Sequence, residues 1–105
     1  MSIFYNHQKL INLFTDTIRG SKGEAIYSVE VEADMILFLT VVDNENFALL
    51  ELKSSGGALI FEVEVEGLRE ISSDHTSVNF YKVGKDAPSL TVQIRPHVSL
   101  QCEAE

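Results

Sequence analysis

The sequence predicts an α+β fold, in which one N-terminal amphipathic helix packs on a strongly bent antiparallel sheet of six or seven strands. Three observations predict this class. Apolar residues near the N-terminus recur at spacings of three and four, as on one face of a helix. Two later stretches alternate between apolar and polar residues, as in half-buried strands. Short, turn-rich connections separate the later stretches, which favours antiparallel neighbours.

The predicted helix spans about residues 6–19. Its stripe is formed by Ile3, His7, Leu10, Phe14 and Ile18. Asn6 is suited to the N-cap position, because its side chain can accept a hydrogen bond from the first turn. Residues 20–23, Gly-Ser-Lys-Gly, are expected to end the helix in a flexible turn.

The stretch 58–66 gives the clearest strand pattern, because three apolar residues alternate with three glutamates: Phe61, Val63 and Val65 with Glu62, Glu64 and Glu66. Residues 24–32 repeat this pattern, with Glu30 and Glu32 on the polar side. If the two strands share a sheet, five glutamates project from the same side: Glu30, Glu32, Glu62, Glu64 and Glu66.

From residue 24 to residue 97 the chain is predicted to contain strands and turns only. The expected strands are 24–32, 35–43, 46–53, 58–66, 69–73, 77–83 and 89–97. The glycines of the segment 54–57 can adopt the positive φ values of a hairpin turn. Residues 1–105 are expected to form a single domain with a loose tail at 101–105.

The second expected strand, residues 35–42, is apolar on both faces. A strand of this composition is usually covered on both sides. The N-terminal helix can provide one cover. A folded-over part of the same sheet or another protein chain can provide the other.

The net charge of −8 is concentrated in one part of the chain. Residues 24–66 contain ten acidic residues against the single basic residue Lys53, a net charge of −9. This balance disfavours direct binding to nucleic acid or to an anionic membrane, both of which require a basic surface. It is compatible with a basic protein partner, or with a face that is merely solvated.

Cys102 is the single cysteine, so an intrachain disulfide is excluded and a reducing compartment is expected. The N-terminus has no signal-peptide pattern, and the longest apolar run, residues 35–39, is far too short to span a membrane. These features predict a cytoplasmic protein.

No motif for catalysis, a metal or a cofactor is present. The alternating glutamates lack the loop oxygens and the glycine of a dedicated calcium site, and the scattered histidines lack zinc-ligand spacing. Asp74, His75 and neighbouring serines suggest a hydrolytic triad only weakly, because all three residue types are common in turns. We therefore expect a protein that is not an enzyme and needs no cofactor.

Three hypotheses on function remain. The first is an acidic cytoplasmic module that binds and neutralises a basic partner such as a nuclease or toxin domain, in the manner of bacterial immunity proteins or phage inhibitors, through Glu30, Glu32, Glu62, Glu64 and Glu66. The second is a homodimeric structural or assembly subunit, in which the strand 35–42 is covered by a second copy. The third is a small ligand-binding domain with an aromatic pocket under the helix, lined by Tyr27, Phe38, Phe61, Phe80 and Tyr81.

Overall fold

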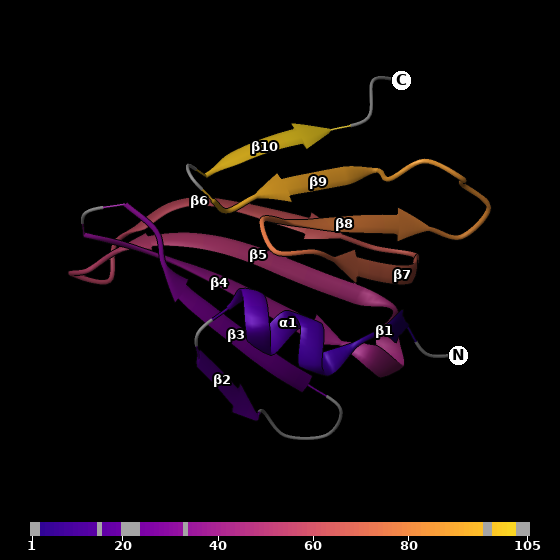
Figure 1. Cartoon of the computed structure of the whole chain (residues 1–105), viewed down its shortest axis with the longest axis horizontal. Helices are drawn as coiled ribbons and strands as arrows, with labels where there is room; N and C mark the ends of the chain where they lie inside the picture. The colour runs from indigo at the N-terminus through magenta and orange to yellow at the C-terminus, as the bar shows by residue number, and fades with distance from the viewer. Residues whose placement is uncertain (1–2, 15, 20–23, 33, 96–97, 103–105) are drawn as a thin grey trace.

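The computed structural model describes residues 3–14, 16–19, 24–32, 34–95 and 98–102. These residues form a mixed α+β fold with one α-helix, one short 3-10 helix and two five-stranded sheets (Figure 1). The elements in chain order are β1 (Phe4–Tyr5), α1 (His7–Leu13), β2 (Asp16–Arg19), β3 (Glu24–Glu30), β4 (Met35–Val42), η1 (Asp43–Glu45), β5 (Phe47–Ser54), β6 (Leu59–Val65), β7 (Leu68–Ser73), β8 (Ser77–Lys82), β9 (Leu90–Gln93) and β10 (Ser99–Cys102).

The helix α1 begins where the sequence predicts. The Asn6 side chain accepts a hydrogen bond of 3.1 Å from the backbone N–H of Lys9, which makes Asn6 the N-cap. At the other end, a guanidinium from far along the chain holds the helix. Arg95 Nη2 donates to the carbonyl oxygen of Leu13 at 3.0 Å, and Arg95 Nη1 donates to that of His75 at 3.1 Å. Arg95 therefore ties the end of α1 to the turn between β7 and β8.

The predicted extent of the helix, residues 6–19, is wrong in its second half. Phe14 already has an extended backbone, with φ −94° and ψ 135°. The chain then forms β2, which contains Thr17 and Ile18 and pairs antiparallel with β3. These two β-branched residues favour a strand, and pairing with β3 gives their backbone groups partners. The predicted turn at residues 20–23 lies outside the described residues.

The first sheet has the strand order β2-β3-β4-β5-β6 and is antiparallel throughout. The two glutamate-rich strands predicted from the sequence, now β3 and β6, do share this sheet. They are not neighbours, however, because β4 and β5 lie between them. The β5–β6 hairpin turns at Gly57, whose φ is +92°, as the glycines of this turn predict.

The second sheet has the order β1-β7-β8-β9-β10, in which β1 runs parallel to β7 and the later strands are antiparallel. The prediction of one bent sheet of six or seven strands is therefore wrong. The chain passes from the first sheet to the second at Gly67, whose φ is +67°, a value that a residue with a Cβ atom rarely adopts. Asn46 holds this corner: its carbonyl accepts from Leu68 N at 2.9 Å, and its Nδ2 donates to Leu68 O at 2.8 Å.

The C-terminal strand corrects a further expectation. Gln101 and Cys102 belong to β10 and pair in register with Thr91 and Leu90 of β9. The predicted loose tail is therefore wrong for these two residues, because a strand ladder holds them. Residues 103–105 lie outside the described part of the chain.

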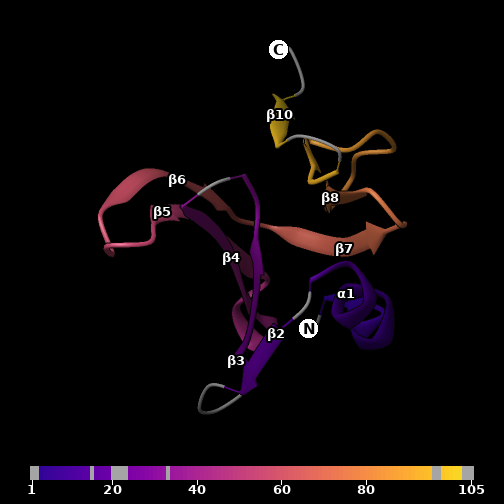
Figure 2. The same cartoon turned by 60° about the vertical axis from the view of Figure 1, so that its left-hand side comes forward.

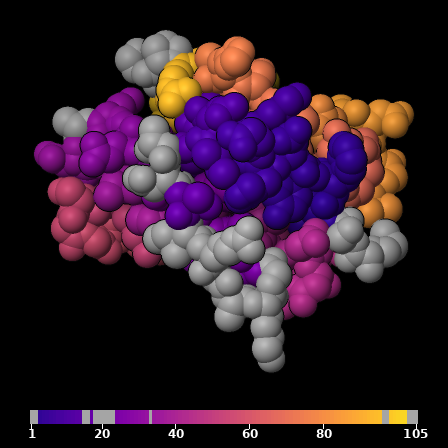
Figure 3. Space-filling view, turned by 60° about the horizontal axis from the view of Figure 1, so that its bottom comes forward, coloured from indigo at the N-terminus to yellow at the C-terminus, as the bar shows by residue number. Residues whose placement is uncertain are grey.

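The core lies in the angle between the two sheets, with α1 in the same angle (Figure 2). Leu10, Leu13 and Phe14 are buried there against residues of both sheets. The hydroxyl of the fully buried Tyr27 is hydrogen-bonded to Nδ1 of His7. Figure 3 shows that the opposite side of α1, in indigo, forms the middle of one surface of the molecule. The helix is thus the cover that the sequence predicts for one face of the sheet.

The strand β4 differs strongly between its two faces. Leu37, Leu39 and Val41 are 0% exposed and belong to the core. Ile36 and Phe38 on the other face remain partly exposed. The expectation that this strand is covered on both sides is therefore met on one side only.

Candidate protein-binding surface

We call the side of β3 to β6 that points away from the core the outer face. The strand register places four rows of residues on it. In three of them each residue is partly or fully exposed, whereas the fourth, Glu24, Val42 and Phe47, contains the buried Val42. One row contains Ile26, Thr40, Leu49 and Glu64, the next contains Ser28, Phe38, Glu51 and Glu62, and the third contains Glu30, Ile36 and Lys53.

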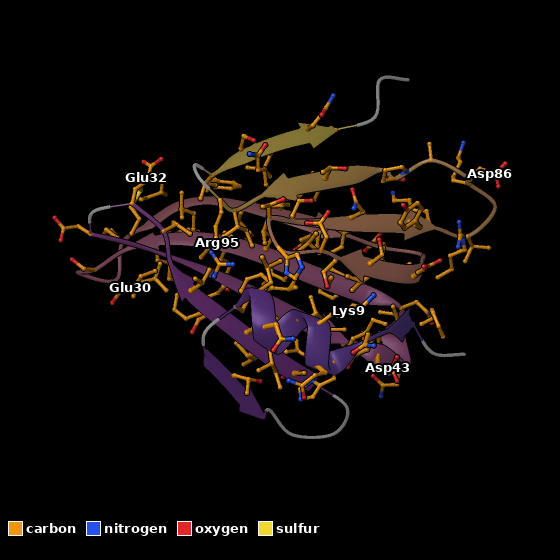
Figure 4. The ribbon with its side chains drawn as sticks, viewed as in Figure 1. Lys9, Glu30, Glu32, Asp43, Asp86 and Arg95 are labelled. Atoms are coloured by element: carbon orange, nitrogen blue, oxygen red, sulfur yellow. The ribbon has the colours of Figure 1, made fainter. Side chains whose placement is uncertain are left out.

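The structure brings three of the five glutamates singled out from the sequence onto the outer face: Glu30, Glu62 and Glu64. Glu32 and Glu66 lie just beyond the ends of β3 and β6 and are exposed. The five side chains do not form one continuous row. Three strand spacings of about 4.8 Å separate β3 from β6. Figure 4 shows Glu30 and Glu32 near one end of the molecule.

Partly exposed apolar side chains lie between the two groups of glutamates, together with Thr40, Glu51 and Lys53. Ile26, Ile36, Phe38 and Leu49 come from β3, β4 and β5 and are partly exposed. The outer face therefore has an apolar centre with acidic residues on either side. Protein-binding surfaces commonly combine an apolar centre with a polar margin.

One basic side chain lies within this acidic face. Lys53 Nζ is 5.3 Å from the centroid of the Phe38 ring and 4.0 Å from Glu51 Oε2. The ring and the carboxylate both attract the ammonium group. Sequence reasoning named Lys53 as a possible offset for the row of glutamates but did not assign Phe38 or Glu51 to this surface. The alternation of Leu50 and Leu52 with Glu51 and Lys53 was a usable signal, but the order of the strands was needed to join it to the glutamates of β6.

In the turn that contains Asp74 and His75, the Asp74 carboxylate has a structural role. One carboxylate oxygen of Asp74 accepts hydrogen bonds from the backbone N–H groups of Thr76 and Ser77, both at 2.8 Å, and from their hydroxyls at 3.1 and 3.2 Å. The two backbone hydrogen bonds are the main reason that the pKa of Asp74 lies below its ordinary value. These bonds stabilise the β7–β8 turn and direct the carboxylate toward the turn's own residues.

Open hollows of about 200 and 220 Å³ lie beside α1 and β7, and Lys9 and Ser73 contribute to both. The first is lined by groups that include Asp74 and His75, and the second by polar groups that include Glu70 together with the apolar Phe4 and Ile71. Because these charges have both signs and Asp74 is committed to its turn, the hollows give no chemical preference for one ligand.

The predicted aromatic pocket under the helix is not formed. Tyr27 and Phe80 are 0% and 1% exposed and fill the core. Phe38 lies on the outer face, and Tyr81 lies on the second sheet beneath the guanidinium of Arg69, 5.2 Å from its ring centroid. Phe61 packs against the same core. The five aromatic residues are therefore divided between the core and two outward faces and do not surround one cavity.

Two other kinds of functional element are absent from the described part of the chain. No group of three or more histidine, cysteine, aspartate or glutamate side chains there is arranged to hold a metal ion. No helix among the same residues is long and apolar enough to cross a membrane.

The fold of the chain is similar to that of a known structure. It superposes with a TM-score of 0.77 on a chain of the contact-dependent growth inhibition toxin–immunity protein complex from Klebsiella pneumoniae 342. The match covers 98% of each chain at 13% sequence identity. No family model and no curated protein sequence matches this chain. The similarity at this identity is one of fold.

Proposed function

We propose that this chain is an immunity-like protein, which binds a basic toxin protein and inhibits it. The observation that carries the proposal is the full-length agreement in fold with a chain of a toxin–immunity complex. The outer face gives independent support, since an apolar centre with acidic margins suits a basic protein surface. The net charge of −8 favours association with the same class of partner.

Inhibition follows from competition for a basic surface. A toxin that acts on nucleic acid needs lysine and arginine side chains to hold the phosphates of its substrate. A protein that presents carboxylates to those side chains excludes the nucleic acid. This function needs neither a catalytic group nor a cofactor in the inhibitor, and it places the inhibitor in the cytoplasm, where the toxin meets its substrate.

The glutamates and the apolar residues have different roles in this proposal. Glu30, Glu32, Glu62, Glu64 and Glu66 attract the partner and orient it, which mainly raises the association rate. The apolar centre around Phe38 is excluded from water in the complex and contributes most to its lifetime. Strand pairing fixes the backbone positions of Glu30, Phe38, Glu62 and Glu64 before the partner arrives.

A direct test is to capture the partner and examine its toxicity. The purified chain is used to retain proteins from the native cell lysate at low salt, and the retained proteins are identified by mass spectrometry. The expected result is a basic protein that stops growth when it is expressed alone and is harmless when it is expressed together with this chain. A retained protein without toxicity, or a toxin that this chain does not neutralise, would contradict the proposal.

Charge reversal then tests the acidic surface. Glu30→Lys, Glu62→Lys and Glu64→Lys are each expected to lower the association rate at low salt by roughly tenfold, and less at high salt, because salt screens the attraction. Asp86→Lys is the matched control, since it makes the same charge change in the β8–β9 connection, at the end of the molecule away from Glu30 (Figure 4). Equal effects of all four changes would assign the attraction to net charge alone.

A homodimer is the second candidate, because the partly exposed apolar residues of β4 could be covered by a second copy. Such a dimer brings two acidic outer faces together, which is unfavourable unless the glutamates are displaced from one another. Light scattering at micromolar concentration distinguishes the two. If the proposed function is correct, the molar mass in the absence of the toxin is the chain mass of 11.7 kDa. A homodimer has twice that mass.

A further inference from the structure

Among the described residues, the edge of β6 that faces away from β5 has no strand partner along its whole length. The strand β6 is the last strand of the first sheet and pairs only with β5 among the described residues (Figure 2). No further backbone hydrogen bond from Leu59–Val65 to another described residue is present. A free edge presents a row of backbone donors and acceptors that can pair with another strand.

The other free edges of the two sheets are shorter. The strand β1 has two residues, and β2 and β10 have four residues each, whereas β6 has seven. The strand β10 contains no charged residue, while β6 contains two exposed glutamates, Glu62 and Glu64. The edge of β6 is therefore both the longest and the most acidic.

The geometry divides this edge into two parts. In the pairing with β5, Leu52 lies opposite Phe61 and Lys53 lies opposite Leu59, so Ile60 is the extra residue of a bulge. The regular part is then Phe61–Val65, long enough for a partner strand of about five residues. Leu59 and Ile60 at the bulge are each 51% exposed and offer apolar contacts at one end.

The side chains of β6 select the kind of strand that fits. Glu62 and Glu64 project on the outer face, while Phe61 and Val63 pack toward the core side. A second copy of β6 would place its own glutamates beside these, and like charges on neighbouring strands destabilise the pairing. A strand with basic residues at alternate positions has the opposite effect on the same carboxylates.

We propose that the free edge of β6 binds an extended segment of the partner protein, in which lysine or arginine alternates with apolar residues. This proposal rests on the proposed function for the source of the segment. The basic side chains lie beside Glu62 and Glu64, the apolar ones lie beside Phe61 and Val63, and the two backbones form a ladder. The added strand extends the outer face by one strand, so the glutamates of β6 become interior to the joint sheet.

The test uses a synthetic peptide, so it does not depend on finding the partner. The probe is a capped heptapeptide of alternating lysine and valine, and the control is a peptide of the same composition with its lysines and valines in separate blocks. Residue-resolved amide hydrogen exchange is measured with each. The alternating peptide is expected to slow exchange in residues 61–65 by about tenfold, because pairing protects the edge amides, and the block peptide is expected to have little effect.

A charge swap completes the test. The double variant Glu62→Lys with Glu64→Lys is expected to lose protection by the lysine peptide and to gain it with a peptide of alternating glutamate and valine. Both positions are exposed, and the melting temperature confirms that the variant is folded. Protection that is absent, equal for both peptide orders, or located on other strands would overturn the edge proposal.

The two proposals fail in different ways. If a toxin is neutralised while the amides of β6 stay unprotected in its complex, the function stands and the edge pairing is wrong. If the peptide protects β6 but no toxin is neutralised, the edge is a strand-binding site and the proposed function is wrong.

Discussion

The two sheets of the molecule differ in how their outward polar groups are used. On the second sheet these groups bind one another. Thr91 Oγ1 donates to Asn79 Oδ1 at 2.7 Å, and Arg69 Nη1 pairs with Glu70 Oε1 at 2.8 Å while its guanidinium lies over the ring of Tyr81. These outward polar groups are therefore satisfied within the second sheet itself, beside the exposed Phe4 of β1, which lies opposite Glu70.

The outer face of the first sheet is arranged otherwise. Its centre contains the apolar Ile36 and Phe38, and opposite them on β5 Lys53 lies 4.0 Å from Glu51. Glu62 lies opposite Glu51 in the strand register, so carboxylates stand beside each other. Like charges side by side and partly exposed apolar residues both lower the stability of the free protein. Such a surface is expected where a partner supplies the missing contacts.

The largest expected effect separates the two faces of β4. Leu39→Ala removes a side chain that is 0% exposed and is expected to lower the free energy of unfolding by about 2–5 kcal/mol. Phe38→Ala, one residue away on the outer face, is expected to cost roughly 1 kcal/mol or less, because its ring is already in contact with water. Urea unfolding of both variants measures the difference. Equal losses would show that the outer face belongs to the stabilising core.

The next largest expected effect is on binding affinity, where the outer face of β4 matters more than its core face. Phe38→Ala is expected to weaken binding to the neutralised toxin by roughly 10- to 100-fold, since aromatic residues at the centre of an interface contribute most. Tyr81→Ala on the second sheet is the matched control and is expected to leave binding unchanged. Calorimetric titration measures both affinities. A larger loss from Tyr81→Ala would move the binding surface to the other sheet.

A smaller effect tests the corner between the sheets. Gly67→Ala is expected to destabilise the protein by about 1 kcal/mol, because alanine is strained at a φ of +67° although its Cβ would meet no atom within 4 Å. Gly56→Ala in the β5–β6 turn is the control, since Gly56 does not have a positive φ and an added Cβ would be 3.9 Å from Ser54 Oγ. Thermal unfolding of both variants measures the two effects. An unchanged stability of Gly67→Ala would mean that the corner does not depend on glycine.

The smallest effect is on pH dependence and involves the β7–β8 turn of the second sheet. The pKa of Asp74 is lower in the folded protein than its ordinary value of 3.8, so the ionised carboxylate stabilises the fold. This contribution is fully present well above pH 3.8 and is lost as the pH falls through the folded-state pKa. Asp74→Asn lacks it, so the stability gap between wild type and variant should narrow on acidification. Because Asp74 is exposed, the gap is small, and a gap that widens in acid would contradict this assignment.

The sequence predicted the elements correctly where their structure depends only on neighbouring residues in the chain. The Asn6 cap, the alternating strands β3 and β6, and the glycine turn between β5 and β6 follow from local chemistry. The end of the helix did not, because Phe14 and Ile18 fit a helical stripe as well as a strand. The ladder with β3, which the sequence does not display, favours the strand at Ile18.

The candidate surface was predictable in its charge and only partly in its geometry. The alternation in β3 and β6 placed Glu30, Glu62 and Glu64 on one side of a sheet. The position of β4 and β5 between them depends on which strands pair. Pairing between distant strands cannot be inferred from the local sequence pattern. For this reason Phe38 was assigned to a pocket in the sequence interpretation, whereas it lies at the centre of the outer face.

The bond between Arg95 and the last carbonyl of α1 has a consequence for the order of events during synthesis. The helix has seven residues, and helices of this length are not stable in isolation. The guanidinium that bonds to its last carbonyl lies 82 residues later in the chain, so the ribosome must synthesise β2 to β9 before that bond can form. The strands β3 to β6 are joined by short connections and can assemble earlier. The helix α1 leaves the ribosome before these strands and is thus fixed after them, and a chain truncated before Arg95 keeps the acidic hairpins but lacks the bond that secures the helix over their inner face.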